Sequence, residues 1–304
     1  EDPLHRRQRR LMQPLFQGDH LKAYAPIVVE KTLALVEGWR DGQTIELAEE
    51  MTRLTLAVIW KVLFGADLGQ EAHAISEAIT LGQKQITSQY NSLLEMVLPL
   101  WWPSPTRRRF LRGVRFLHDT VDRQIRAQRQ AARQGENILS RLLDTRDEDG
   151  QAMSDAQIRA EIMTLLLAGH ETTANAMSWC WYLLALHVEV EREMREEVAA
   201  ALDGRVPTMA DLPRLSFVGQ VLAEAMRLYP PAWILHARVA QIHDRLPSGH
   251  TIPTGMQVFL SPYAMQRDPA VFADPDRFDP DRFAPSQQSQ ISACGYFPFG
   301  GGAR

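Results

Sequence analysis

The sequence has little cysteine and no excess of basic charge. Only Cys180 and Cys294 occur among its 304 residues. Two cysteines cannot build the disulfide framework of a secreted domain, so we expect a reducing, cytoplasmic environment. The net charge at neutral pH is −4, which argues against a protein dedicated to nucleic-acid binding.

Long apolar runs are absent as well. A membrane-spanning helix needs about 18 or more consecutive apolar residues, and no segment of the sequence approaches that length. Residues 93–102 are apolar, but this stretch is short and contains Pro99. The sequence starts with Glu1 instead of methionine, so we expect a piece of a longer protein and draw nothing from missing targeting signals.

What the sequence does have is helical periodicity. Residues 20–40 and 46–64 repeat apolar side chains every three or four positions, which predicts amphipathic helices. Residues 106–134 form a long, arginine-dense helical stretch. Between residues 104 and 133, nine arginines stand against two aspartates, and this local charge of 9 − 2 = +7 is typical of a solvent-exposed helix face.

Start and stop signals delimit two further helices. An acidic turn at residues 144–150 is followed by Ser154 and Gln157, which can form a capping box in front of a helix that starts at Ile158 and runs past Trp181. Another helix over residues 214–228 is stopped by a double proline.

The pattern changes after this helix. Residues 232–262 alternate apolar and polar side chains, with turn signals at 247–249 and 253–255, which predicts a small β component. The remainder is rich in proline and aromatic residues and is expected to be coil. No repeat or linker divides the sequence, so we expect one mainly helical domain over residues 1–304.

A polar cluster at residues 168–173 interrupts the apolar part of the helix that starts at Ile158. Polar side chains in a buried helix cost free energy unless they find partners, so the cluster requires an explanation. Gly169 beside Ala168 would let a flat ligand approach the backbone, and Thr172 can hydrogen-bond back into the helix and open it locally for water or dioxygen. A zinc helix is excluded because His170 has Ala174, and no second histidine, four positions later. A helix crossing of small residues with a satisfied polar pair is the structural alternative.

Glu224 and Arg227 lie three positions apart on one helix face. The residues around them are apolar, so the pair is expected to be buried, where each charge needs its partner. Arg282, farther along the chain, is a third candidate for this network.

The sequence ends in Phe297-Pro298-Phe299-Gly300-Gly301-Gly302-Ala303-Arg304. Three glycines alone more often mark a flexible turn. Together with the upstream motifs, in this order, the ending resembles the haem-binding loop of the cytochrome P450 family. The resemblance runs from His5 to Arg304 through five motifs. It implies the family's fold, a helical bundle around haem with a minor β component, here lacking the N-terminal part and the part from the haem-ligand cysteine onward.

The resemblance assigns roles to individual residues around haem b. Thr172 would hydrogen-bond dioxygen, Glu171 would relay protons through water, and the cysteine that binds iron is expected two residues after Arg304, outside the sequence. Glu224, Arg227 and Arg282 would form a structural triad. Further cofactor contacts are implied for His5, Arg9, Ala168, Gly169, Arg238, Phe297, Gly300 and Arg304. Cys294 precedes Phe297, so it is expected to be a small packing residue, as is Cys180.

The function implied by the resemblance is monooxygenation. One oxygen atom of O2 would enter an apolar small molecule of the terpenoid, polyketide or fatty-acid type, with NAD(P)H electrons delivered by a ferredoxin, a flavodoxin or a reductase. The basic segment around Arg6 and Arg10 would dock an acidic redox partner. Two alternatives stay open: a haem-thiolate enzyme that uses peroxide or rearranges its substrate, and a non-catalytic helical binding or scaffold protein. Without the cysteine, the chain itself is expected to be inactive.

Overall fold

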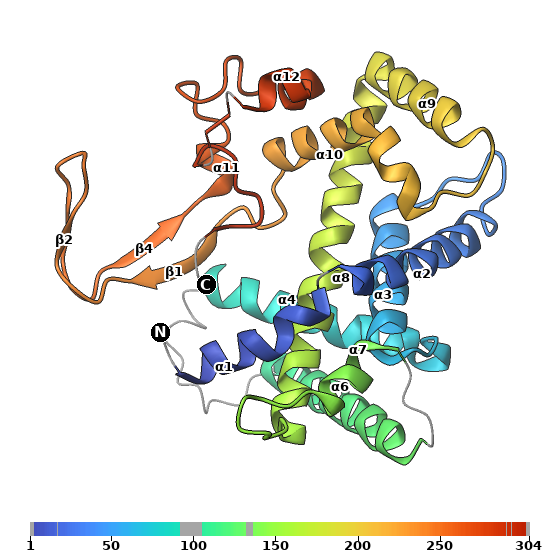
Figure 1. The fold of residues 1–304 in the computed structure, drawn as a ribbon, viewed down its shortest axis with the longest axis vertical. Coiled ribbons are helices and arrows are strands. Elements are labelled where there is room, and N and C mark those ends of the chain that lie inside the picture. The colour runs from blue at the N-terminus through green and yellow to red at the C-terminus, as the bar shows by residue number, and fades with distance from the viewer. Residues whose placement is uncertain are drawn as a thin grey trace. The chain divides into compact units, whose positions relative to one another are not determined.

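The computed structural model describes residues 3–16, 18–91, 105–131, 136–289, 291–292 and 294–301. The chain is mainly helical, as predicted, and forms two compact units, residues 1–171 and 172–304 (Figure 1). The boundary between the units falls inside one continuous helix, α8 (Asp155–Leu186). That residues 1–304 act as a single domain stays a prediction.

The first unit is built almost entirely from helices. Its fully buried core residues include Leu63, Ile75, Leu142 and Ile162. Helix α4 packs along α6, α2 packs along α3, and both α3 and α6 contact α7. The elements are α1 (Pro3–Met12), η1 (Gln13–Phe16), α2 (Asp19–Val36), α3 (Leu47–Phe64), η2 (Gly69–Glu71), α4 (Ala72–Asn91), α6 (Pro105–Gln130), α7 (Ile138–Asp144) and the first half of α8.

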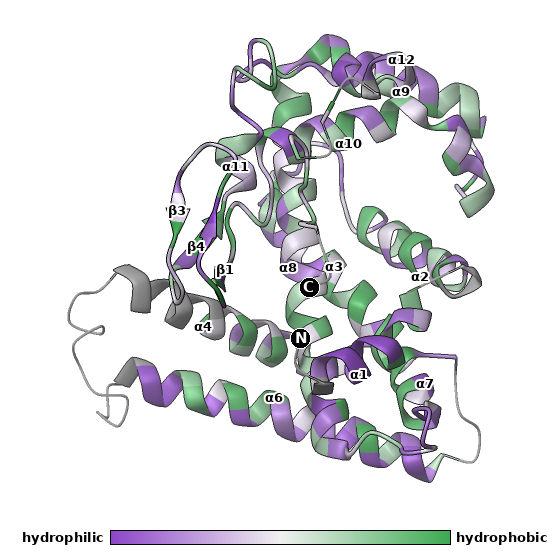
Figure 2. Cartoon of the chain, turned by 60° about the vertical axis from the view of Figure 1, so that its left-hand side comes forward, coloured by the Kyte–Doolittle hydropathy of each residue, from purple (hydrophilic) through white to green (hydrophobic). Residues whose placement is uncertain are grey.

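Arginine-dense α6 is an amphipathic helix, as its sequence predicts. Hydrophilic and hydrophobic residues alternate along it in Figure 2. Leu117, Val121 and Ile125 lie on its buried face, and arginines such as Arg112 and Arg126 are exposed.

Helix α8 begins with the predicted capping box. The backbone N–H of Ser154 donates to Oε1 of Gln157 at 2.9 Å, and the N–H of Gln157 donates to Oγ of Ser154 at 3.3 Å. These bonds satisfy orphan donors of the first turn, which places the helix start at Asp155, three residues before the predicted Ile158.

The second unit combines helices with two small antiparallel sheets. Strand β1 (Leu235–Val239) pairs with β4 (Gln257–Leu260), and β2 (Asp244–Arg245) pairs with β3 (Thr251–Ile252). The minor β component is therefore confirmed. Gly249 and Gly255 have φ values of +87° and +83° at the two predicted turns, a backbone conformation that favours glycine.

The remaining elements of this unit are short, apart from α9 and α10. The sequence did not predict α9, because its many charged residues leave only a weak apolar stripe. Short helical turns also replace part of the expected coil. These elements are the second half of α8, α9 (Val188–Leu202), η3 (Met209–Arg214), α10 (Ser216–Leu228), α11 (Pro262–Met265), η4 (Pro280–Phe283) and α12 (Pro285–Gln288).

In the described part of the chain, no helix combines the length and hydropathy that a bilayer crossing requires. The apolar stretch at residues 93–102 lies outside the described residues.

Candidate functional site

Helix α8 divides its residues between a buried and an exposed face. The buried face repeats every four residues through Ile158, Ile162, Leu166, His170 and Ala174. At about 100° per residue, the opposite face carries Ala168 and Thr172, which are exposed. The polar cluster is thus split, with the histidine in the core and the threonine on the open side.

The exposed face forms a continuous stripe along the middle of α8. We call this the α8 stripe; its members are Thr164, Ala168, Thr172, Asn175 and Trp179. Most of these side chains are small. Glu171, predicted to relay protons, borders the stripe and is half-buried.

Gly169 has a packing partner within the first unit. A Cβ atom on Gly169 would lie 3.1 Å from Cδ1 of Ile59 in α3, which is tighter than most contacts in proteins. The close approach of α3 therefore explains the glycine by itself. A contact between Gly169 and a cofactor stays a prediction.

His170 is buried with 2% of its surface exposed. Burial lowers its pKa, although the nearby carbonyls of Leu166 and Leu167 oppose the shift. The imidazole therefore lies on the core-facing side of α8.

Glu224 and Arg227 form an ion pair with both side chains completely buried. Nε of Arg227 donates to Oε2 of Glu224 at 2.6 Å, and Nη2 donates to Oε1 at 2.8 Å. Burial raises the pKa of Glu224, and the bonds from Arg227 and from the N–H of Asp279 oppose this rise. Arg282 completes the predicted cluster, with its Nε 3.5 Å from Oε1 of Glu224.

Arg227 also holds the coil that follows α11. Nη1 donates to the carbonyls of Gln266 and Pro275, each at 2.7 Å, and Nη2 donates to the carbonyl of Arg277 at 3.1 Å. The guanidinium also lies 5.0 Å from the ring centre of Phe272. One side chain thus connects α10 with three points of a segment that lies 39 to 50 positions farther along the chain.

The glycine-rich loop is anchored at its start by two residues that the sequence analysis missed. The hydroxyl of Tyr296 donates to the carbonyl of Ala223 at 3.1 Å. The N–H of Phe297 donates to Oε1 of Gln266 at 3.1 Å. Both bonds tie the loop to α10 and to the coil beside it.

The last described residues of the loop meet strand β1. Nη2 of Arg238 donates to the carbonyl of Gly301 at 3.3 Å. Gly300 has φ +74°, and a Cβ atom there would lie 3.4 Å from Leu235. Between the contacts at Phe297 and Gly301, the side chain of Phe299 is 86% exposed. Arg304 lies outside the described residues.

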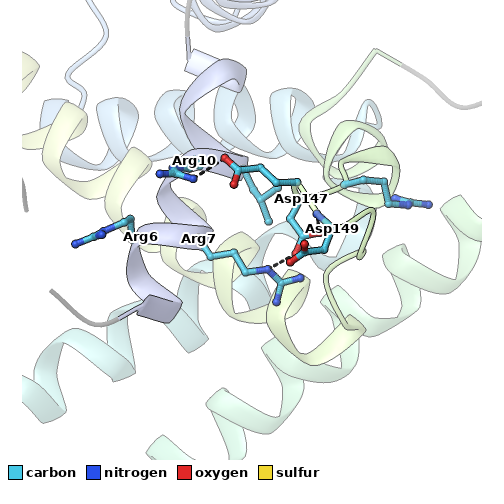
Figure 3. Close-up of a pocket in the computed structure, with 8 residues that line it drawn as sticks. Arg6, Arg7, Arg10, Asp147 and Asp149 are labelled. Atoms are coloured by element: carbon cyan, nitrogen blue, oxygen red, sulfur yellow. Dashed lines mark hydrogen bonds and ion pairs between the residues drawn. The ribbon is translucent and has the colours of Figure 1, made fainter.

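Two arginines of α1 form ion pairs within the first unit. Nε of Arg7 lies 2.6 Å from Asp147, and Nη1 of Arg10 lies 2.6 Å from Glu148, so α1 is tied to the acidic turn before α8 (Figure 3). Arg6 points away from this turn in the same view and is exposed. The predicted docking helix is therefore partly neutralised by its own chain.

His5 and Arg9 differ in exposure. His5 is half-buried and lies near Glu161 of α8; burial raises the pKa of Glu161, and His5 opposes the rise. Arg9 is exposed.

The two cysteines behave differently from each other. Cys180 is 7% exposed in the core of the second unit, and burial raises its pKa to about 11, as expected for an inert packing thiol. Cys294 is exposed, so its prediction as a packing residue is wrong. It lies in a surface turn, where its N–H donates to Oγ of Ser292, and surface loops follow no apolar periodicity that would reveal exposure.

Comparisons with known proteins agree on one family. Residues 1–304 match the family described as Cytochrome P450. Cyclooctatin synthase of Streptomyces melanosporofaciens is 36% identical, and pentalenene oxygenase of Streptomyces avermitilis is 35% identical, each over 99% of this chain. The crystal structure of the cytochrome P450DA heme domain superposes with a TM-score of 0.88 at 30% identity, covering 99% of this chain.

The chain spans about two thirds of the length of these proteins, namely 65%, 66% and 66%. The predicted fold, incomplete relative to these proteins, is thus confirmed. The chain belongs to the cytochrome P450 family.

Proposed function

We propose that the protein is a haem-thiolate monooxygenase that inserts one oxygen atom of O2 into an apolar small molecule. The observation that carries this proposal is the α8 stripe, on which Ala168 and Thr172 are exposed while His170, between them in sequence, is buried. Small side chains exposed along the middle of this helix of 32 residues support the proposal, because a flat ligand can approach them closely.

The described residues fit a bound haem. Phe299, 86% exposed on a loop anchored at Phe297 and Gly301, presents an aromatic surface that a flat apolar group would cover. We expect Phe299 to contact the porphyrin in addition to Phe297 and Gly300. When bound, haem supplies the redox-active iron at which dioxygen is reduced. His5, Arg9 and Arg238, with Arg304, would hold the propionates by charge-assisted hydrogen bonds.

Thr172 and Glu171 are proposed to control protons on the substrate side. Reducing dioxygen to water and an inserted oxygen atom consumes two protons, and a closed apolar pocket holds little water to supply them. The Thr172 hydroxyl would donate a hydrogen bond to dioxygen. The half-buried Glu171 carboxyl, one residue earlier on α8, would hold a proton for delivery through water.

The cluster of Glu224, Arg227 and Arg282 is proposed to have a structural role. It fixes α10 against the coil from Gln266 to Asp279 and takes no part in the chemical step. Electrons from NAD(P)H would arrive through a ferredoxin, a flavodoxin or a reductase. Exposed Arg6 of α1 would contribute to the docking face.

The substrate class is proposed from the relatives. An apolar small molecule of the terpenoid, polyketide or fatty-acid type fits the family, and pentalenene, which pentalenene oxygenase is named for, is the first compound to test.

The test is Thr172→Ala in the full-length protein, reconstituted with a ferredoxin and its reductase. Product formed per NAD(P)H is expected to fall several-fold while hydrogen peroxide rises, because dioxygen loses its hydrogen-bond donor. Thr173→Ala, one residue on and on another face of α8, is the matched control and should leave the ratio near the unsubstituted value.

Other outcomes would decide against the proposal. An unchanged ratio in Thr172→Ala would remove the proposed role of Thr172. Product formed from added peroxide alone, equally in both variants, would indicate the peroxide-using alternative. A full-length protein without the red-shifted ferrous–CO band of thiolate ligation would indicate a binding or scaffold protein.

A further inference from the structure

Gln266 is completely buried, with 0% of its surface exposed. It follows α11 and belongs to none of the motifs that carry the family resemblance. A buried amide is costly unless its donor and acceptor groups are satisfied, so its partners indicate what it does.

The amide of Gln266 connects α10 to the glycine-rich loop. Nε2 donates to the carbonyl of Met226 at 3.1 Å and to that of Arg227 at 3.0 Å. Oε1 accepts from the N–H of Phe297 at 3.1 Å. The opposite orientation of the amide would place its oxygen against two carbonyls, so only this orientation satisfies all three contacts.

The carbonyls to which Gln266 donates belong to the last turn of α10. That turn leaves carbonyls without intrahelical partners, which must be satisfied from outside the helix. The neighbouring Arg267 donates to the carbonyl of Leu228. Its guanidinium also lies over the rings of Tyr263 and Tyr229, at 4.1 Å and 5.2 Å from their centres. Gln266 and Arg267 thus cap three successive carbonyls and fix the end of α10.

Gln266 is itself held in place by the buried ion pair. Its backbone carbonyl accepts from Nη1 of Arg227 at 2.7 Å. The contacts therefore form a chain from Glu224 through Arg227 and Gln266 to the N–H of Phe297.

We propose that Gln266 is a positioning residue that sets the place of Phe297, and with it the start of the haem loop, relative to α10. This inference rests on the proposed function, because the loop matters for chemistry only if it holds haem. Tyr296 supports the same end of the loop by donating to the carbonyl of Ala223, but Tyr296 is the residue before the loop and not part of it. At the start of the loop, Gln266 contacts the loop backbone directly.

The experiment compares Gln266→Met, Gln266→Asn and Glu197→Ala in the full-length holoprotein. Gln266→Met keeps side-chain volume but removes all three polar contacts. Gln266→Asn keeps an amide that is one methylene too short to reach α10 and Phe297 together. Glu197→Ala removes a cap from the other end of α10 and is the control for general loss of stability.

The first readout is hydrogen exchange in the peptide containing residues 296–301. Because a lost hydrogen bond removes local protection, its amides are expected to exchange about tenfold faster in Gln266→Met and about threefold faster in Gln266→Asn, with less than about a twofold change in Glu197→Ala. If Gln266→Met does not fold, Gln266→Asn carries the comparison. Exchange within about twofold of the unsubstituted protein in the folded Gln266 variants would overturn the proposal.

The second readout is the ferrous–CO spectrum. Gln266→Met and Gln266→Asn are expected to show a smaller share of the thiolate-ligated band than Glu197→Ala. Equal shares in all variants would also overturn the proposal. Absence of the band from the unsubstituted protein would instead contradict the proposed function, and exchange would still report whether Gln266 anchors the loop.

Discussion

Arg227 uses every N–H of its guanidinium. The group has five donors, and the structure assigns them to both carboxylate oxygens of Glu224 and to the carbonyls of Gln266, Pro275 and Arg277. A saturated guanidinium in a dry environment cannot exchange a lost partner for water. This explains why a single buried ion pair matters here, although most ion pairs on protein surfaces contribute little.

Glu224→Ala should therefore destabilise the protein strongly. Removing one member of a buried pair leaves the other charge without compensation, at a cost of about 3–5 kcal/mol in the free energy of unfolding. Urea denaturation of the full-length protein measures this loss. Glu191→Ala is the matched control, because it breaks the exposed i,i+4 pair with Arg195 on α9 and should cost less than about 1 kcal/mol. Similar small losses in both variants would contradict the assignment of a stability role to the buried pair.

Single residues were predictable from the sequence where their partners are close along the chain. The spacing of Glu224 and Arg227, and the apolar residues around them, already indicated a buried pair. Gln266 gave no such signal, because its partners lie 31 to 40 positions away and a glutamine carries no pattern of its own. Gly169 was ambiguous for another reason: a missing side chain serves a ligand or a neighbouring helix equally well, and only the position of Ile59 shows the helix contact.

At the scale of elements, α9 and α10 are joined by a carboxylate that caps a helix from outside. Glu197 of α9 accepts from the N–H groups of Phe217 and Val218 at 2.8 Å and 2.9 Å, and from Oγ of Ser216 at 3.1 Å. The two N–H groups are first-turn donors of α10, which have no partner within the helix. A negative charge at this end also interacts favourably with the helix dipole.

Glu197→Ala is expected to lower the free energy of unfolding by about 1 kcal/mol, the usual cost of losing an N-terminal cap. Glu193→Ala, an exposed glutamate on the same helix, removes the same charge from α9 and should change stability by less than about 0.5 kcal/mol. Thermal unfolding of the two variants gives the comparison. Equal effects would show that net charge, and not capping, stabilises α10.

The elements themselves were predictable to the extent that they carry start and stop signals. The capping box marked the start of α8, and glycine and proline marked the turns of the small sheets. Helix α9 was missed because glutamate and arginine dominate it. Its contacts with α10, including the cap from Glu197, are tertiary and leave no periodic trace in the sequence.

At the scale of the whole molecule, α8 contributes to both hydrophobic cores. Ile158, Ile162 and Leu166 belong to the core of the first unit, and Leu183 and Leu184 belong to that of the second. One continuous helix therefore contributes side chains to both cores.

Leu166→Ala and Leu184→Ala should each cost about 2–5 kcal/mol, because both remove buried side chains and leave cavities. We expect both to lower the midpoint of one shared unfolding transition, since α8 cannot unwind in one core without weakening the other. Leu186→Ala, 60% exposed at the end of the same helix, should have little effect. Circular dichroism and tryptophan fluorescence would be recorded together. Separate transitions, each sensitive to only one substitution, would contradict the coupling.

The contacts between Arg227 and the coil after α11 also determine which positions of the sequence tolerate substitution. Arg227 reaches main-chain carbonyls at Pro275 and Arg277, and a carbonyl is present whatever the side chain. The path of the coil is therefore encoded at position 227, and the exposed residues it passes are left open to variation. A library randomised at Ala273 and Arg277 should return many folded variants, whereas one randomised at position 227 should return almost only arginine. For anyone recombining segments among relatives, this coil is a natural place for a crossover.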